Sequence, residues 1–197
     1  MYTVYTHPQS RSLRVLWALE ELGAEYEIIK VDLLTPTPQV VSPHPRGKVP
    51  FLVDGNTSVC ETMAICIYLC QQQPGTSLYS TQVDEQAQIN AWLSFAMTDL
   101  ETPIWGLLRQ KIFVPEAERC EEMTYYFQQD AERALASLRL EHRWIAGDTF
   151  TVADIFMSHV LSWARQWGLE LNQSLHDYID AAMNRPAFLR AQAINEA

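Results

Sequence analysis

Residues 46–68 constrain the fold of this chain more than any other part of its sequence. Pro50 opens an apolar run, and the Asp54-Gly55 pair separates that run from a second one. An Asp-Gly pair between two apolar runs is a strong signal for a β-hairpin. Because proline cannot donate a hydrogen bond to a sheet, we expect Pro50 at the start of an edge strand.

A helix is expected to follow this hairpin, with Glu61 and Thr62 in its first turn. Backbone N–H groups in the first turn of a helix have no partner within the helix, and the helix dipole is positive there. The start of this helix is therefore suited to hold a carboxylate.

Residues 1–73 as a whole have the pattern of a compact α/β unit. A strand is expected over Tyr2–Thr6, followed by a helix that starts near Ser10 and ends at Gly23. Residues 25–31 form a second strand pattern, parallel to the first if the helix is a crossover. Four prolines within residues 36–45 then predict an irregular loop before the hairpin.

Residues 82–197 are expected to be all-helical, after a linker rich in Gln, Pro and Gly near residues 71–77. Apolar residues at helical spacing predict a helix over residues 89–107, kinked at Pro103, and another over residues 116–140. Thr151 and Asp154 have the spacing of a capping box. The helix that they begin is apolar nearly all round and is expected to be central. Two shorter helices, around residues 173–183 and 186–193, complete the pattern.

The balance of charge excludes some classes of partner. The chain has 14 Lys and Arg against 24 Asp and Glu, a formal net charge of −10, and no long basic cluster. No nucleic acid partner is therefore expected. No apolar run approaches the ~18–20 residues that span a bilayer. Residues 1–7 lack the basic start and the apolar core of a signal peptide. We expect a cytoplasmic protein with no membrane partner.

The four cysteines show no pattern of paired disulfides, and we expect reduced thiols that serve mainly as small apolar residues. No His or Cys pair matches them at the spacing of a metal site, so no metal is expected. The cysteines are Cys60, Cys66, Cys70 and Cys120.

Several motifs, in order along nearly the whole chain, resemble the cytosolic glutathione S-transferase family. They are Ser10-Arg11-Ser12-Leu13-Arg14-Val15-Leu16, Gly47-Lys48-Val49-Pro50, Glu61-Thr62-Met63-Ala64-Ile65, Asp148-Thr149-Phe150-Thr151-Val152-Ala153-Asp154 and Asn184-Arg185-Pro186-Ala187. The closest likeness is to bacterial and fungal-type members that begin with a Ser-Arg-Ser motif.

This resemblance implies a thioredoxin-like α/β domain over residues 1–73 that binds glutathione as co-substrate. It also implies an all-α domain over residues 82–197 that contributes the electrophile pocket, and a homodimer. The expected activity is conjugation of glutathione to small hydrophobic electrophiles. Isomerase, dehalogenase or peroxidase chemistry and a non-catalytic glutathione-binding or scaffold role stay open. A thiol–disulfide reductase is disfavoured, since residues 7–10 hold no Cys-x-x-Cys pair.

The resemblance also implies which residues bind glutathione. Lys48 corresponds to a contact with the glycine carboxylate, a role that suits an ammonium. Val49 corresponds to the residue whose backbone pairs with the cysteinyl part, and Pro50 to a cis-proline. Glu61 and Thr62 correspond to a Glu-Ser pair that holds the γ-glutamyl carboxylate. Threonine in place of serine keeps the hydroxyl and adds a methyl group.

Ser10 is the residue expected to activate the thiol. A hydroxyl near a helix start can donate a hydrogen bond to the sulfur, where the dipole favours an anion. A thiol of pKa about 8.5 then becomes a thiolate at neutral pH. A simple helix cap is the structural alternative for Ser10. Ser12, Tyr5 and His7 are the further candidates for the group that faces the sulfur.

The second half of the chain offers candidates for an apolar electrophile surface. Trp105, Leu108, Phe113 and Trp163 lie in helical patterns, where a role in the core is the alternative to ligand binding. Asp99 is expected to face solvent, although some relatives use an acid on this helix to reach the neighbouring subunit's glutathione amine.

Overall fold

A computed structural model describes residues 1–196 of the chain. Its contacts divide the chain into two compact units. Unit 1 comprises residues 1–81 and the segment that begins at Met183, and unit 2 comprises Gln82–Ala182. The helical domain expected over residues 82–197 includes the last helix, whereas this helix packs within the first unit.

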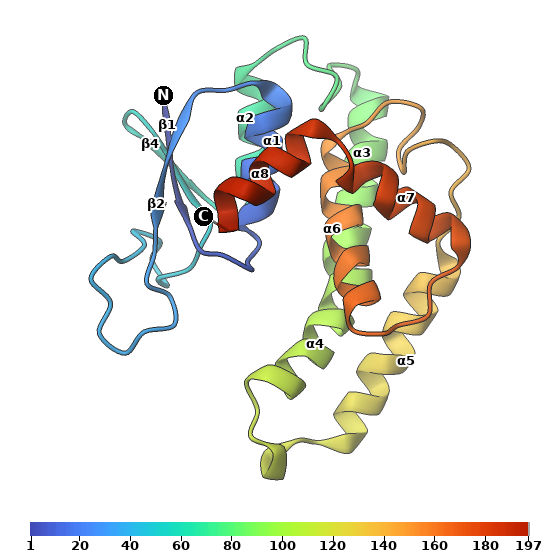
Figure 1. The fold of residues 1–197 in the computed structure, drawn as a ribbon. Coiled ribbons are helices and arrows are strands. Elements are labelled where there is room, and N and C mark those ends of the chain that lie inside the picture. The colour runs from blue at the N-terminus through green and yellow to red at the C-terminus, as the bar shows by residue number, and fades with distance from the viewer. Residues whose placement is uncertain (197) are drawn as a thin grey trace. The chain divides into compact units, whose positions relative to one another are not determined.

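Unit 1 is built on a four-stranded mixed sheet with strand order β2-β1-β3-β4 (Figure 1). The strands are β1 (Tyr2–Thr6), β2 (Tyr26–Lys30), β3 (Phe51–Asp54) and β4 (Thr57–Cys60). β1 and β2 are parallel, while the β1–β3 and β3–β4 pairs are antiparallel. The expected parallel pair and the expected hairpin are therefore both confirmed.

One expectation about the hairpin is wrong. β3 lies between β1 and β4, so it is an internal strand and β4 is the edge. Pro50 nevertheless fits, because it directly precedes β3 and its missing N–H is not needed by the ladder. The Val49–Pro50 bond is cis, as the resemblance implied.

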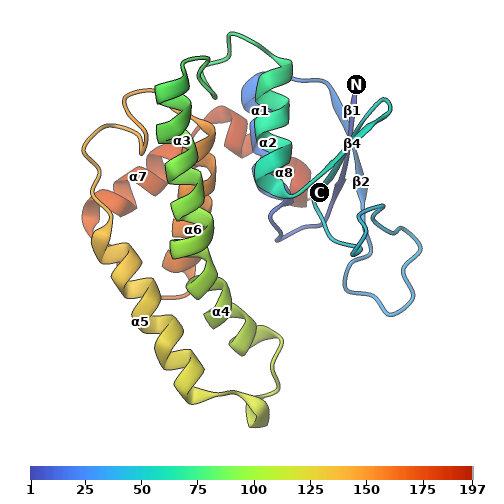
Figure 2. The same ribbon diagram turned by 180° about the vertical axis from the view of Figure 1, so that it is seen from behind.

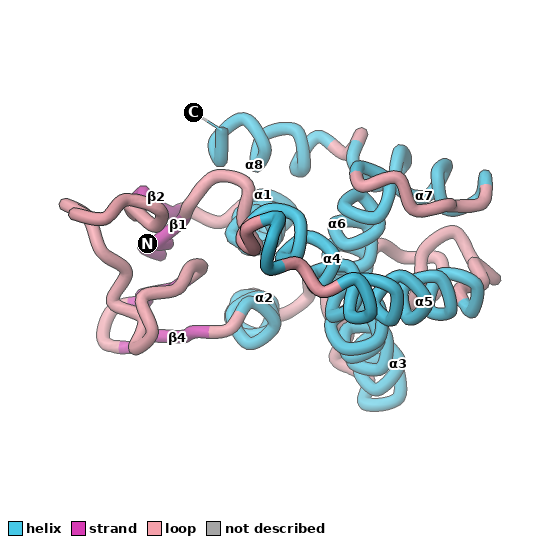
Figure 3. The backbone as a smooth tube through the Cα atoms, turned by 90° about the horizontal axis from the view of Figure 1, so that it is seen from below, coloured by secondary structure: helices cyan, strands magenta, loops and turns pink. Residues whose placement is uncertain are grey.

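Helices α1 (Ser12–Leu22) and α2 (Thr62–Gln72) cover the same face of the sheet, and α8 (Pro186–Glu196) packs along α1 (Figure 3). The ring of Trp17 on α1 is fully buried, and its centroid lies 4.7 Å from that of Phe188. The Arg185 guanidinium donates two hydrogen bonds, of 2.6 and 2.7 Å, to the Glu21 carboxylate. These contacts explain why α8 belongs to unit 1.

Unit 2 is all-helical (Figure 2). Its elements are α3 (Val83–Phe95), a π-helical turn (Ala96–Leu100), α4 (Glu101–Ile112), a 3₁₀ turn (Glu116–Glu118), α5 (Glu121–Ser137), α6 (Val152–Gln166) and α7 (Gln173–Met183). Every residue of α6 from Val152 to Leu161 is buried, which confirms that this helix is central. Within residues 1–196, no helix is both long and apolar enough to cross a membrane.

The long helix expected over residues 89–107 is interrupted upstream of Pro103 by the π-helical turn. Pro103 has no N–H to offer the carbonyl four residues earlier, at Asp99. The Thr102 hydroxyl donates to the Met97 carbonyl oxygen at 3.2 Å and satisfies one acceptor in the widened turn. The proline therefore changes the helix in the turn that precedes it.

The capping box at the start of α6 is confirmed. The buried Asp154 carboxylate accepts hydrogen bonds of 2.8 Å from the backbone N–H groups of Thr151 and Ile145 and from the Tyr178 hydroxyl. Burial raises the pKa of Asp154, and these hydrogen bonds oppose that rise. The side chain therefore ties the loop before α6 and helix α7 to the core of unit 2.

The four cysteines are free thiols, as expected. Cys66 and Cys70 are buried on α2, while Cys60 and Cys120 are partly exposed. Burial raises the pKa of Cys70 to about 12 and raises that of Cys66 as well. The two thiols on α2 therefore act as apolar packing groups.

Candidate functional site

Three segments that are distant in the sequence meet at one end of the sheet in unit 1. Tyr5, near the end of β1, pairs with Phe51 at the start of β3, and Phe51 also pairs with Cys60 at the end of β4. The loop after β1, the residues before β3 and the start of α2 therefore share this end. These segments carry the residues that the sequence proposes for the site: Ser10, Lys48, Val49, Pro50, Glu61 and Thr62.

Ser10 lies in the loop between β1 and α1, where hydrogen bonds hold its hydroxyl. Its Oγ donates to the His7 carbonyl oxygen at 2.6 Å and accepts the backbone N–H of Ser12 at 3.1 Å. The two serine hydroxyl oxygens lie 2.9 Å apart. Arg11 occupies the N-cap position of α1, so Ser10 lies just before the helix and not in its first turn.

The other candidates for contact with a thiol are more constrained. Ser12 is fully buried, and its Oγ accepts the His7 N–H at 3.4 Å. His7 Nδ1 lies 3.0 Å from a carbonyl oxygen just after β2. Because a carbonyl only accepts, Nδ1 carries a proton that is already used. The Tyr5 ring packs edge-on against Phe51. The geometry thus favours Ser10.

The start of α2 offers unfilled hydrogen-bond donors. Glu61 is its N-cap residue, and no side chain caps the helix there. Glu61 also has a φ of +69°, which is uncommon for a residue other than glycine and costs on the order of 1–3 kcal/mol. Such conformations cluster at ligand sites. Thr62 is buried, while the Glu61 side chain is largely exposed.

The loop that precedes Val49 is ordered by its own hydrogen bonds. The Ser42 hydroxyl donates to the Lys48 carbonyl oxygen at 2.6 Å and accepts the His44 N–H at 3.2 Å. The Arg46 N–H in turn donates to Nδ1 of His44 at 3.0 Å. The Lys48 side chain is exposed. This network fixes the backbone that leads into the cis peptide bond.

His44 is a residue of the site that no sequence pattern singles out. It is buried, and its Nε2 lies 3.9 Å from the Glu61 carboxylate, which also pairs with Arg46 at 3.2 Å. In the sequence His44 lies between two prolines, a pattern that indicates only a loop. Its contact with Glu61 joins residues 17 positions apart, and no local sequence pattern predicts such a contact.

His44, Cys60 and Glu61 bring three potential metal ligands within 4.8 Å of one another. Nδ1 of His44 accepts the Arg46 N–H, so in the neutral ring Nε2 carries the proton and faces Glu61. A metal ligand needs a lone pair at that nitrogen. The ring is therefore arranged as a hydrogen-bond donor to a carboxylate.

Unit 2 contains a cluster of partly exposed aromatic rings. The ring centroid of Trp105 lies 6.0 Å from that of Phe113 and 6.2 Å from that of Trp163, and His159 packs on Trp163 at 4.8 Å. Three of the residues proposed for an electrophile surface thus form one cluster, while Leu108 is buried. We call Trp105, Phe113 and Trp163 the aromatic cluster.

Comparison with known proteins identifies clear relatives. Models of the glutathione S-transferase N-terminal and C-terminal domains match residues 1–71 and 112–186. The probable glutathione S-transferase GSTF2 of Oryza sativa subsp. japonica is 33% identical over 157 residues, 75% of this chain and 72% of that protein. Glutathione S-transferase GstA of Escherichia coli O157:H7 is 28% identical over 191 residues, 93% of this chain and 92% of that protein.

A solved structure gives the same result for the fold. The ternary complex of BphK, a bacterial glutathione transferase, superposes with a TM-score of 0.86 at 25% identity, over 99% of this chain and 100% of that chain. The expected combination of a thioredoxin-like α/β unit with a helical unit is therefore confirmed.

Proposed function

This chain belongs to the glutathione S-transferase family and is a glutathione transferase, and we propose that it binds glutathione at the end of the unit 1 sheet and activates the thiol with Ser10. The observation that carries the proposal is the convergence of three separate segments at that end of the sheet. Each segment supplies a different polar group, and together they match the parts of one tripeptide.

We propose that the γ-glutamyl carboxylate binds the uncapped start of α2, next to the Thr62 hydroxyl. The free N–H groups and the positive end of the helix dipole favour an anion there. The Glu61 carboxylate is suited to the γ-glutamyl ammonium, and the Lys48 ammonium to the glycine carboxylate. The backbone of Val49 would then hold the cysteinyl residue between them.

Thiol activation by Ser10 is supported by the direction of its hydrogen bonds. Ser10 Oγ already accepts the Ser12 N–H, and the Ser12 hydroxyl is close enough to donate to it as well. Two donors to one oxygen strengthen the hydrogen bond that this hydroxyl donates onward. When a thiolate is present, the Ser10 proton turns from the His7 carbonyl to the sulfur. This hydrogen bond lowers the pKa of the thiol and leaves the sulfur as the nucleophile.

We further propose that the aromatic cluster of unit 2 binds the electrophile. Its rings are partly exposed and offer an apolar surface without a formal charge. Burial of an apolar electrophile on such rings is favourable by about 25 cal/mol per Å² of surface removed from water. The cluster therefore suits small hydrophobic substrates, with aryl halides as convenient probes.

The test is Ser10→Ala, with Ser58→Ala on the exposed part of β4 as a matched control. With glutathione and an aryl halide, we expect kcat to fall about 10- to 100-fold in Ser10→Ala, since one donor to a developing anion is lost. Its pH–rate profile should move to higher pH, because the bound thiol has a higher pKa. Retention on glutathione resin should survive in both variants.

Full turnover by Ser10→Ala with an unchanged pH profile would refute the role of Ser10. The same profile measured on Ser12→Ala, Tyr5→Phe and His7→Asn would then identify the group that faces the sulfur. A loss of binding to the resin without a change in the pH profile would indicate a role in binding alone.

We also propose that the protein is a homodimer of the serine-using, bacterial or fungal type that acts in the cytoplasm. The Ser-Arg-Ser motif at residues 10–12 supports the type, and membership of the family supports the dimer. Light scattering of the purified chain should give twice the monomer mass of 22.6 kDa. A mass equal to one chain at assay concentrations would contradict the dimer.

A further inference from the structure

The end of α4 carries Phe113, the most exposed ring of the aromatic cluster. Phe113 is 56% exposed, and the rings of Trp105 and Trp163 are less so. Phe113 and Trp105 are eight positions apart, about 12 Å along a helix, yet their ring centroids lie 6.0 Å apart. The Phe113 side chain therefore reaches back along α4, and little packing around its exposed ring fixes its place. Its position depends on the backbone at the end of the helix.

Arg119 holds the backbone on both sides of Phe113. Its guanidinium donates to the Lys111 carbonyl oxygen at 3.1 Å and to the Val114 carbonyl oxygen at 3.2 Å. The last carbonyls of a helix have no partner within the helix, and the negative end of the dipole favours a cation there. One side chain thus joins the last turn of α4 to the residue that follows Phe113, with Phe113 between the two points.

Two further contacts hold the end of α4 in place. The side-chain oxygen of Gln110 accepts the backbone N–H of Cys120 at 3.4 Å, which brings the segment after the 3₁₀ turn against α4. The Lys111 ammonium lies 4.9 Å from the ring centroid of Trp167, just after α6. Trp163, the third ring of the cluster, is one turn earlier on α6. The end of α4 is therefore anchored to the helix that carries the opposite side of the cluster.

We propose that Arg119 is a positioning residue for the electrophile: by holding the carbonyls of Lys111 and Val114, it fixes the Phe113 ring as the outer wall of the aromatic cluster. Arg119 need not touch the electrophile in this role, because it acts through Phe113. The role rests on the proposed function, in which the cluster binds the electrophile. A wall that is fixed before binding loses less conformational entropy on binding. The arrangement therefore favours flat aromatic electrophiles that pack against the Phe113 ring.

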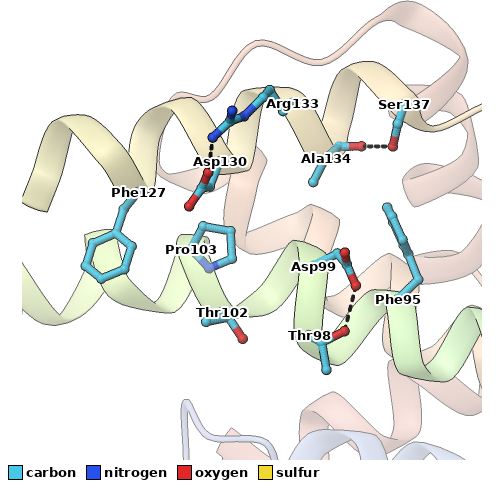
Figure 4. A pocket seen from close by; sticks show the side chains of 10 residues that line it. All are labelled: Phe95, Thr98, Asp99, Thr102, Pro103, Phe127, Asp130, Arg133, Ala134 and Ser137. Atoms are coloured by element: carbon cyan, nitrogen blue, oxygen red, sulfur yellow. Dashed lines mark hydrogen bonds and ion pairs between the residues drawn. The ribbon is translucent and has the colours of Figure 1, made fainter.

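A cap that only stabilises the helix is the alternative, and the end of α5 offers the comparison. There the Ser137 hydroxyl donates to the Ala134 carbonyl oxygen at 2.7 Å (Figure 4). The Arg139 guanidinium donates to the carbonyl oxygens of Ala136 and Leu138 at 2.6 and 2.8 Å. Because α5 runs back along α4, this end lies away from the end of α4 (Figure 1). Arg139→Gln therefore removes the same kind of cap without reaching the aromatic cluster.

The test measures steady-state kinetics of Arg119→Gln and Arg139→Gln with glutathione and an aryl halide. In Arg119→Gln we expect the KM for the aryl halide to rise about 3- to 10-fold, the size of one aromatic ring contact. The kcat, the KM for glutathione and the pH–rate profile should stay unchanged, because only uniform binding of the electrophile is lost. Arg139→Gln should change none of these quantities. Circular dichroism checks that both variants are folded.

A double-mutant cycle tests whether Arg119 acts through Phe113. Phe113→Ala should raise the aryl halide KM at least as much as Arg119→Gln, and adding Arg119→Gln to it should change the KM by less than about 1.5-fold. Additive effects of the two changes, an unchanged KM in Arg119→Gln, or equal effects of Arg119→Gln and Arg139→Gln would overturn the role of Arg119. An unchanged KM in Phe113→Ala would instead refute the electrophile surface itself, and the role of Arg119 falls with it.

Discussion

Removal of a single buried hydroxyl, in Tyr178→Phe, should destabilise the fold of unit 2 measurably. Tyr178 is buried on α7, and its hydroxyl donates to the Asp154 carboxylate at 2.8 Å. Phenylalanine has nearly the same shape, so the substitution removes the hydrogen bond without leaving a large cavity. The change therefore measures this one interaction between α7 and the capping box of α6.

The expected cost is about 2 kcal/mol in the free energy of unfolding. Hydrogen bonds to charged groups contribute roughly 1.5–3 kcal/mol. Asp154 keeps its hydrogen bonds from the backbone of Thr151 and Ile145, so the carboxylate is not left without donors. For a chain of 197 residues, a loss of this size lowers the melting temperature by roughly 4–8 °C.

The contribution of Asp154 to the free energy of unfolding changes with pH in a definite direction. Burial raises the pKa of Asp154 in the folded state, so its protonated form favours folding. Its contribution to stability is largest below the unfolded pKa and is lost as the pH rises through the folded pKa. Tyr178 opposes this by donating to the charged form, and the variant should have a still higher folded pKa. The destabilisation should therefore be full at pH values above the folded pKa of Asp154 and shrink as Asp154 becomes protonated.

The measurement is urea unfolding of the wild-type and variant chains, followed by circular dichroism at several pH values. Tyr125→Phe is the control, because Tyr125 is 60% exposed and its loss of a hydroxyl should cost less than about 0.5 kcal/mol. A cost in Tyr178→Phe no larger than in the control would refute the argument, as would a cost that grows when Asp154 is protonated.

Two further predictions concern packing. Gly106→Ala should destabilise the fold by about 1–3 kcal/mol despite the better helix propensity of alanine, because the new Cβ would lie 2.7 Å from the Phe127 ring. Melting curves with and without Phe127→Leu test this prediction. A destabilisation that Phe127→Leu does not reduce would contradict it. Native protein should show two fast-reacting thiols with Ellman's reagent and four after denaturation, and rapid reaction of all four without denaturant would contradict the burial of Cys66 and Cys70.

Local chemistry made much of the fold predictable. The Asp54-Gly55 pair, the terminating Gly23 and the Thr151–Asp154 spacing each act over a few residues, and each is found where the sequence placed it. Gly23 has a φ of +61°, a conformation that glycine adopts without strain. Such signals predict where elements begin and end because their physical causes lie within one turn of chain.

Contacts between residues far apart in the sequence were harder to predict. The internal position of β3 depends on the pairing of Tyr5 with Phe51, which joins residues 46 positions apart. The assignment of α8 to unit 1 depends on contacts such as Arg185 with Glu21, separated by 164 positions. Hydrophobic periodicity finds the helix, but it does not say which neighbour covers its apolar face.

The candidate site shows the same difference between short sequence signals and long-range contacts. Motifs brought Ser10, Val49 and Thr62 to notice, since the resemblance depends on short stretches of sequence. The ring of His44 acquires its contacts only when the loop folds back on itself and on Glu61.

The return of the chain from unit 2 to unit 1 has a consequence for synthesis on the ribosome. Residues 82–182 are made after the sheet and before α8, the helix whose Phe188 covers Trp17. At about 5–20 residues per second, this interval lasts roughly 5–20 s. During that time the nascent first unit has all its strands but shows an apolar stripe of α1 to the surrounding solution. A chaperone that binds such stripes would have its longest opportunity then, and the synthesis of α8 ends it.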